Sequence, residues 1–464
     1  GERYSLEACD PTEVGSTVIL TLKERFRVLL EGGELRALLE RYCALLPLPV
    51  FLGADPVAVN AEAPPWRDDE PNPARRLARR RSFAARFERR FEPLCVMEIA
   101  PREGSDLRGL LWVQDARTYG TSDNRNLAVF VRGMLLDDDA RELLPAWAGF
   151  VGGVIESAKL TPTASREDLQ RDTAWKAASE HLTEALIGGL ARVAHEEPEA
   201  WRRVLLRHNE ALLGCALCDP RLMDLLAHEL TVPTSEGDLA ARTVLKRSDN
   251  RAYISLGTRG GFEEMLFRAL KVPIAAGIRY GVLPFLREYC ARRGGAVVEL
   301  GTEEGNRHVF RAAPVSADER AWLEKHLLRP GQRLVTARFQ PASLPLVLVP
   351  DRDAELKQRL ESDEADKRIA GATLKLARIY TRTLDATATA DLYVNVDSPA
   401  LRALLDARAH GDDSVAEGAR LLRALVALMA GWNEGSGRVD LSAALDDFTD
   451  TAVALFARRT ENAP

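Results

Sequence analysis

The sequence has little of what marks a secreted, membrane-bound or metal-dependent protein. Six cysteines in 464 residues are too few and too scattered for a disulfide framework. No apolar run approaches the roughly 20 residues that a membrane-spanning helix needs. The seven histidines are scattered, and neither an HExxH nor a GxSxG motif occurs. We therefore expect a cytoplasmic protein with no membrane partner and no metal site, which is not by itself a self-sufficient enzyme.

Composition indicates an ordinary globular protein. The chain is 46% hydrophobic and 28% charged, with a formal net charge of −6. Its length allows two to four domains with real cores. Since the charge gives no global basic field, nucleic acid is not an expected partner. Residue 1 is glycine rather than methionine and no signal peptide follows, so we expect the chain to begin partway through a longer protein.

The most informative segment runs from Leu136 to Gln170. It reads as an acidic turn, an amphipathic helix, a loop, and a second helix that opens at Ser165. Ser165 and Asp168 have the spacing of an ordinary helix start. Arg166 and Gln170, four apart, would then project from one face of that helix. They could meet a phosphate held elsewhere in the protein, or Arg166 could be a solvated residue of a plain helix start.

Four runs of this segment follow one another as they do in a known family. They are 136–139 (LDDD), 141–147 (RELLPAW), 152–157 (GGVIES) and 165–170 (SREDLQ). In this order they resemble the middle segment of the heat-shock protein 90 family, whose bacterial members are called HtpG. Further similar runs lie at 15–23, 45–52, 92–94, 107–113, 208–210 and 392–399.

The resemblance implies the middle and C-terminal domains of an ATP-dependent chaperone, without the N-terminal domain that holds ATP and Mg²⁺. By position in SREDLQ, Arg166 matches the catalytic arginine that reaches the γ-phosphate of ATP, and Gln170 matches its companion amide. The fragment alone is expected to bind no ATP. Its partners would be non-native client proteins. Thr163 stands where the family usually has asparagine.

The predicted elements indicate an α/β (α+β) multidomain protein. We expect the end of a preceding segment at 1–14, a large α/β sandwich at 15–171, a helical connector at 172–235, a small α/β part at 236–312 and an α+β dimerisation domain at 313–464. A capping box at Ser316 and Glu319 begins this last domain. Strands are predicted at 17–22, 50–52, 110–113, 128–131, 252–256 and 296–300, and a helix at 262–270.

Two apolar stripes near the end of the chain carry a second prediction. Ser414 and Glu417 have capping-box spacing and open the first helix; a glycine-rich break at 431–437 precedes the second. Each stripe could pack on its own domain. The family instead pairs the last two helices of each subunit, which implies a C2 homodimer through 415–456. The candidate interface residues are Leu421, Leu422, Leu425, Leu428, Met429, Leu441, Leu445, Phe448, Ala452 and Phe456.

Three further patterns each have a structural and a functional interpretation. The run from Arg75 to Arg90 holds eight arginines and one acid, Glu88; it predicts an amphipathic helix whose basic face is solvated or binds nucleic acid. Cys215 and Cys218 have CxxC spacing without a second pair, which favours buried thiols over zinc. The run 257–261 favours a tight turn over a phosphate loop. An ATP-dependent chaperone, a nucleotide-independent holdase or scaffold, and a nucleic-acid-binding module therefore all stay open.

Overall fold

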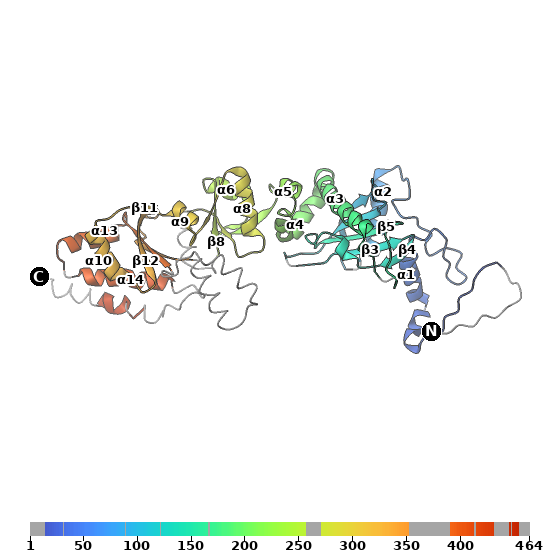
Figure 1. The fold of residues 1–464 in the computed structure, drawn as a ribbon, viewed down its shortest axis with the longest axis horizontal. Helices are drawn as coiled ribbons and strands as arrows, with labels where there is room; N and C mark the ends of the chain where they lie inside the picture. Colours follow the sequence, from blue (N-terminus) through green and yellow to red (C-terminus); the bar gives the residue numbers. More distant parts are fainter. Residues whose placement is uncertain are drawn as a thin grey trace. The chain divides into compact units, whose positions relative to one another are not determined.

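The computed structural model describes residues 14–30, 32–88, 90–120, 122–165, 168–256, 271–351, 390–412, 414–430, 445–446 and 448–453. The chain divides into two compact units. The first comprises residues 1–114, 124–146 and 151–190, and the second comprises 115–123, 147–150 and 191–464. Mixed sheets with helices confirm the predicted α/β multidomain class (Figure 1). No helix in the described ranges is long and apolar enough to cross a membrane.

The first unit is built on a mixed five-stranded sheet with the order β1-β2-β5-β3-β4. Neighbouring strands are antiparallel except β3 and β5, which are parallel. The strands are β1 (Pro93–Ile99), β2 (Arg108–Gln114), β3 (Asn126–Val131), β4 (Met134–Asp137) and β5 (Val151–Ser157). The helices that begin in this unit are η1 (Glu24–Leu30), α1 (Gly32–Tyr42), α2 (Pro73–Phe87), η2 (Arg141–Leu143) and α3 (Thr173–Glu196).

Strands β2 and β3 confirm the predictions at 110–113 and 128–131, but the loop predicted at 152–157 is wrong. That run is β5, the central strand of the sheet. A Cβ atom on Gly152 would lie 2.3 Å from Nε1 of Trp112, and one on Gly153 would lie 2.7 Å from Leu111 Cδ2. The two glycines therefore let neighbouring side chains cross the strand, rather than marking a turn.

Three other local predictions for this unit are also wrong. The amphipathic helix expected near 141–147 is only the 3-10 turn η2, since Pro145 has no amide hydrogen to continue a helix. Residues 17–22 and 50–52 form no strand. Val18 and Leu20 are exposed, and the Val50 amide donates to Asn60 Oδ1 at 2.8 Å within a loop. Apolar β-branched sequence alone does not make a strand without a neighbouring strand to pair with.

Helix α2 packs its apolar face on the sheet. Asn72 caps the helix, its side chain accepting from the amides of Ala74 and Arg75. Phe87 makes an edge-to-face contact with Phe130, with ring centroids 5.9 Å apart. The buried residues of this core are Ala44, Leu45, Trp66, Phe83, Ala84, Phe87, Val96, Leu110, Trp112, Ala128, Phe130 and Val154.

The second unit begins with helices and a second five-stranded sheet, of order β10-β8-β9-β6-β7. The helices α4 (Pro198–Cys215) and α5 (Pro220–Leu226) confirm most of the helical segment predicted at 172–235, but the end of that range is a strand, at 231–234. Strands β8 (Arg251–Ser255) and β10 (Ala296–Glu299) confirm two predicted strands. The helix predicted at 262–270 and the turn at 257–261 lie outside the described residues. The remaining elements are β6 (Thr231–Thr234), β7 (Gly237–Ala240), α6 (Ala241–Arg247), β9 (Ile274–Ala276), α8 (Val282–Arg293) and α9 (Glu303–Val309).

A four-stranded sheet of order β11-β12-β14-β13 completes the second unit. The predicted capping box opens α10 (Ala317–Leu327): the Glu319 amide donates to Ser316 Oγ at 3.2 Å, and the Ser316 amide donates to Glu319 Oε2 at 2.8 Å. The other elements are β11 (Arg311–Ala312), β12 (Gln332–Arg338), β13 (Leu346–Pro350), β14 (Ala390–Asn395), α13 (Pro399–Ala409) and α14 (Val415–Ala430).

Candidate functional site

The segment predicted to carry the catalytic arginine leaves the sheet at the end of β5. Asp106 fixes this exit: its Oδ1 accepts from Ser157 Oγ at 2.6 Å, and its Oδ2 accepts from the Ala158 amide at 2.8 Å. Ser157 Oγ in turn accepts from the amides of Lys159 and Leu160. One buried hydroxyl and one carboxylate thus satisfy three backbone amides where the strand ends.

Beyond this exit the chain doubles back as a short hairpin. The Thr163 amide donates to the Asp168 carbonyl at 2.9 Å, and the Gln170 amide donates to the Thr161 carbonyl at 2.8 Å. Pro162 and Leu169 pair as an antiparallel bridge. The side chain of Leu169 is buried. Both flanks of the 164–167 segment are therefore held by main-chain bonds and by an apolar anchor.

This hairpin replaces the helix that the sequence predicted from Ser165, so that prediction is wrong. Ser165 Oγ lies 3.1 Å from Thr163 Oγ1. The helix begins only at Thr173, where Asp172 accepts from the Trp175 amide at 2.9 Å. That hydrogen bond, ahead of smaller contributions, lowers the pKa of Asp172. Asp172 therefore has the capping role that we assigned to Ser165.

Of the two predicted catalytic residues, the structure describes Gln170 and not Arg166. Arg166 lies outside the described residues, as does Glu167. Gln170 is exposed, and its side-chain amide donates to the Pro162 carbonyl at 2.9 Å. The helix face predicted to carry Arg166 and Gln170 together is not formed at Gln170, because Gln170 lies in no helix. Gln170 therefore braces the hairpin.

Carboxylates gather around the base of the hairpin. Burial, followed by the nearby charges of Asp168, Asp138 and Asp139, raises the pKa of Asp137 at the end of β4. Arg41 pairs with Asp138 at 3.1 Å. Arg171, just beyond the hairpin, pairs with Glu142 and lies over the Trp175 ring at 5.3 Å. The acidic turn and the SREDLQ segment, separate in sequence, therefore share one electrostatic environment.

The sequence reasoning missed Asp106 and Ser157, which anchor the hairpin. The available signal was a serine that follows the apolar residues of the run 151–157. It was overlooked because the two glycines in that run suggested a loop. No sequence pattern predicts the role of Asp106, because its partner Ser157 lies 51 residues away in the sequence.

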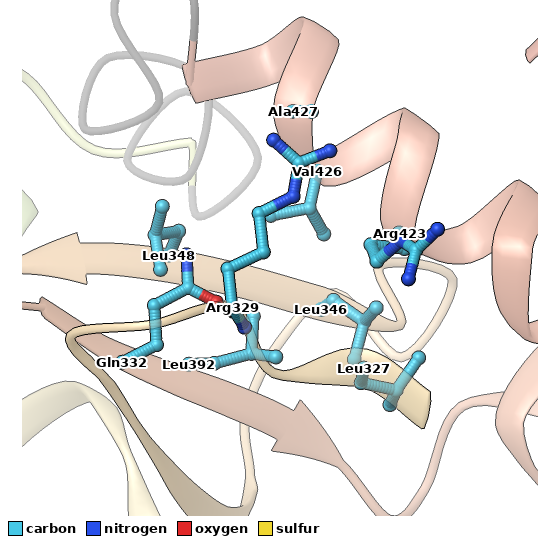
Figure 2. A pocket seen from close by; sticks show the side chains of 9 residues that line it. All are labelled: Leu327, Arg329, Gln332, Leu346, Leu348, Leu392, Arg423, Val426 and Ala427. Carbon is cyan, nitrogen blue, oxygen red and sulfur yellow. Dashed lines mark hydrogen bonds between the residues drawn. The ribbon is translucent and has the colours of Figure 1, made fainter. Parts of the chain in front are cut away.

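The first of the predicted interface helices, α14, uses one face within its own unit. Val415, Ala419 and Val426 are buried in a core shared with α10 and the last sheet. A small hollow of about 30 Å³ separates α14 from strands β13 and β14 (Figure 2). Figure 2 shows Val426 and Arg423 above the side chains of Leu346 and Leu392. The internal packing that we considered for this stripe therefore exists.

Other predicted interface residues are less completely covered. Leu421, Leu422, Leu425 and Leu428 of α14 are only half-buried. In the second stripe Leu445 is exposed, and Phe448 and Ala452 are half-buried on helical chain. Leu441 and Phe456 lie outside the described residues, and so does the side chain of Met429. Apolar surface therefore remains on both stripes after folding.

The basic run forms the predicted helix, α2, up to Phe87. Three of its arginines are paired with carboxylates. Arg79 pairs with Asp68, Arg80 pairs with Glu98, and Arg86 pairs with Glu62 at 2.9 Å. Because phosphate binding needs clustered, available cations, these pairs favour the solvated-face interpretation over the nucleic-acid one.

The CxxC pair has no metal-binding arrangement. Cys215 is buried and donates to the Trp147 carbonyl at 3.2 Å, whereas Cys218 is exposed. Burial raises the pKa of both thiols, which makes them poor nucleophiles. The expectation of buried thiols is therefore correct for Cys215 and wrong for Cys218. Across the described ranges, no group of three or more His, Cys, Asp or Glu side chains could hold a metal ion.

The hairpin lies in a segment that is similar to known proteins. The family model described as Hsp90 protein matches residues 106–219, which include Asp106 and the whole hairpin. Chaperone protein HtpG of Chlorobaculum tepidum is 24% identical over 246 residues, covering 51% of this chain and 38% of that protein. HtpG of Nitrosospira multiformis is 27% identical over 212 residues, covering 42% and 33%. HtpG of Roseobacter denitrificans is 24% identical over 225 residues, covering 48% and 36%.

The match covers only part of this chain and part of each relative. It takes in about half of this chain and spans only about a third of the length of each relative. Within that extent it contains the sheet exit, the hairpin and the helices that follow, in one continuous segment. Over this segment the chain is similar to the heat-shock protein 90 family of chaperones and to its bacterial members called HtpG.

Proposed function

We propose that this chain is the middle and C-terminal part of an ATP-dependent chaperone, in which Arg166 acts on ATP bound with Mg²⁺ by another domain. The family match over 106–219 supports the proposal, since it covers the SREDLQ segment. The observation that carries it is the braced hairpin around that segment. Its flanks are pinned by the Thr163–Asp168 and Gln170–Thr161 main-chain bonds.

The chemistry follows from the charge of a guanidinium. Phosphoryl transfer spreads negative charge over the γ-phosphate oxygens, and an arginine directed at them lowers the barrier. Since the arginine and the nucleotide belong to different domains, hydrolysis would require the domains to close. Firmly held flanks favour this role, because a cation delivered across a domain gap needs a defined position.

Client binding, dimerisation and a bacterial cytoplasmic location complete the proposal. Apolar side chains on the first unit support client binding: Phe26, Val28 and Leu30 of η1 are all exposed. Clustered exposed apolar residues are typical of protein-interaction surfaces. The half-buried leucines of α14 support dimerisation. The paired arginines of α2 weigh against the nucleic-acid alternative.

The test compares Arg166→Ala with Arg171→Ala in the complete gene product that contains this chain. Arg171 is the matched control, since it is a nearby arginine already paired with Glu142. We expect Arg166→Ala to lower the ATPase rate by about tenfold or more, below the largest arginine effects known for NTPases. Arg171→Ala should retain at least half the rate.

A client assay separates the chaperone from the holdase interpretation. Aggregation of thermally unfolding malate dehydrogenase is followed by light scattering with and without ATP. If Arg166→Ala leaves both the ATPase rate and ATP-dependent protection unchanged, Arg166 has no catalytic role. Protection by the wild type that is the same with and without ATP would instead support the nucleotide-independent holdase.

A further inference from the structure

The turn between β1 and β2 lies at the point where the chain leaves β5 towards the hairpin. This turn is closed by main-chain hydrogen bonds between Arg102 and Ser105, each amide donating to the other residue's carbonyl at 3.0 Å. Gly104 within it has a φ of +81°, a left-handed conformation that glycine adopts without strain. The turn is therefore a short element of defined conformation, and it is followed directly by Asp106.

Asp106 holds the chain where β5 ends. Its carboxylate accepts from the Ser157 hydroxyl at 2.6 Å and from the Ala158 amide at 2.8 Å. Hydrogen bonds to an ionised acceptor are about twice as strong as bonds between neutral groups. Together, these two bonds fix the direction in which the chain leaves the strand.

The same turn also contacts the helix that follows the hairpin. His181, in the first half of α3, has its Nδ1 2.8 Å from Ser105 Oγ. Both side chains are buried, at 5% and 6% exposure. Since Ser105 and Asp106 are adjacent, one short turn bonds to the chain before the hairpin and to the helix after it. The position of the hairpin between these two ends therefore depends on the turn.

We propose that this turn positions the hairpin for ATP hydrolysis, with Asp106 as the positioning residue. The inference rests on the function proposed above for Arg166. An arginine that must reach a phosphate held by another domain is sensitive to small displacements, since a shift of about 1 Å can lower a rate by about 100-fold. Asp106 acts through the strand exit and not on the nucleotide. Its loss should therefore lower kcat and leave the binding of ATP unchanged.

The experiment compares ATP hydrolysis by Asp106→Ala and Asp106→Asn in the complete gene product that contains this chain. Asp106→Ala removes both acceptor oxygens and should lower kcat about tenfold or more, with the KM for ATP within about twofold of the wild-type value. Asp106→Asn keeps the shape and one acceptor oxygen, so its kcat should lie between those of the wild type and Asp106→Ala. If Asp106→Ala does not fold, Asp106→Asn decides by the same comparison.

Glu88→Ala is the matched control for a loss of stability. Glu88 accepts from side chains of the same sheet, Trp112, Gln114 and Asn126, none of which belongs to the turn or the hairpin. Well below its Tm, Glu88→Ala should keep kcat within about twofold of the wild type. A loss of kcat as large as that of Asp106→Ala would show that stability, and not position, is responsible. A rise in the KM of Asp106→Ala without a fall in kcat would equally contradict the proposal.

The double variant Asp106→Ala/Arg166→Ala tests whether Asp106 acts through Arg166. If it does, the double variant should hydrolyse ATP no more slowly than Arg166→Ala alone, because residues that act together have non-additive effects. A further loss of about tenfold would show that Asp106 acts independently of Arg166, and the proposal would then be wrong.

Hydrogen exchange of the complete gene product without nucleotide separates this proposal from the one for Arg166. In Asp106→Ala, amide exchange in peptides covering 158–170 should be about tenfold faster than in the wild type, with exchange in α2 unchanged. Unchanged exchange at 158–170 would overturn the positioning role, whatever the Arg166 variant does. Faster exchange combined with a wild-type rate for Arg166→Ala would support the hold of Asp106 on the hairpin and contradict only the catalytic role of Arg166.

Discussion

The side-chain amide of Gln170 donates to the main-chain carbonyl of Pro162 at 2.9 Å, across the two arms of the hairpin. This bond joins the residue predicted to accompany the catalytic arginine to the opposite arm of its own segment. We therefore expect Gln170 to position the hairpin, with the chemistry left to Arg166. Gln170→Leu should lower the ATPase rate of the complete protein about fivefold, the effect of one hydrogen bond of about 1 kcal/mol.

Lys159→Leu is the control for this prediction, because Lys159 is exposed and contributes only its backbone amide to the hairpin base. Its ATPase rate should stay within twofold of the wild type. A Gln170→Leu rate as low as that of Arg166→Ala would show that Gln170 itself acts on the nucleotide.

Much of the fold could be predicted where the sequence signal is local. The capping box at Ser316, the amphipathic helix α2 and the strands β2 and β3 all follow from short-range periodicity or spacing. The predictions failed where contacts between residues far apart in the sequence determine the secondary structure. Gly152 marks a strand because Trp112 occupies the space of its missing side chain.

The candidate site shows the same division. The order of family motifs located the segment around Arg166, whereas the helix assigned to it was wrong. Serine is a common N-cap residue, which is why a helix was predicted from Ser165. The bridge between Pro162 and Leu169 forms instead, stabilised by the burial of Leu169. That burial cannot be predicted from the spacing of residues in the sequence.

The second prediction concerns the contribution of the buried Glu88 carboxylate to stability. Glu88 accepts from Trp112 Nε1 at 2.9 Å, Gln114 Nε2 at 2.8 Å and Asn126 Nδ2 at 3.2 Å. Glu88→Ala leaves these donors without their acceptor and should reduce the free energy of unfolding by about 2–4 kcal/mol. Urea unfolding followed by tryptophan fluorescence measures it, with exposed Glu103→Ala as a control expected to change stability by less than about 0.5 kcal/mol.

The contribution of Glu88 should also depend on pH. Burial acts to raise its pKa, but the hydrogen bonds from Trp112, Gln114, the Arg90 amide and Asn126 outweigh burial and lower it below 4.5. A lowered folded-state pKa stabilises the native state above the unfolded pKa, and this stabilisation is lost as pH falls through the folded value. The difference between wild type and Glu88→Ala should therefore shrink below about pH 4.5. A difference that stays constant from pH 6 to pH 3 would contradict this account.

Two adjacent glycines of α3 should respond in opposite directions to the same substitution. A Cβ atom on Gly188 meets nothing within 4 Å, whereas one on Gly189 would lie 2.6 Å from Met97 Sδ and 3.0 Å from Met97 Cβ. Gly188→Ala should stabilise the protein by about 0.5–1 kcal/mol through helix propensity. Gly189→Ala should destabilise it by about 1–3 kcal/mol through overpacking. Equal changes in urea midpoint would contradict the packing of α3 on β1.

The proposed dimer can be tested through side chains that the isolated chain leaves in solvent. Leu445 and Val453 are 49% and 61% exposed, so replacing both by lysine should leave the fold of the subunit intact. If both are covered by the partner subunit, two buried lysines without counter-charges should raise the dimer dissociation constant by at least about 100-fold.

Val57→Lys is the matched control for the dimer test, because Val57 is 59% exposed and lies in the first unit. Sedimentation equilibrium at micromolar concentration should show a dimer for the wild type and for Val57→Lys, and a monomer for the double variant. A monomeric wild type removes the dimer altogether. A double variant that dimerises as tightly as the wild type instead moves the interface away from this stripe, and the half-buried leucines of α14 would then be accounted for by packing within their own unit.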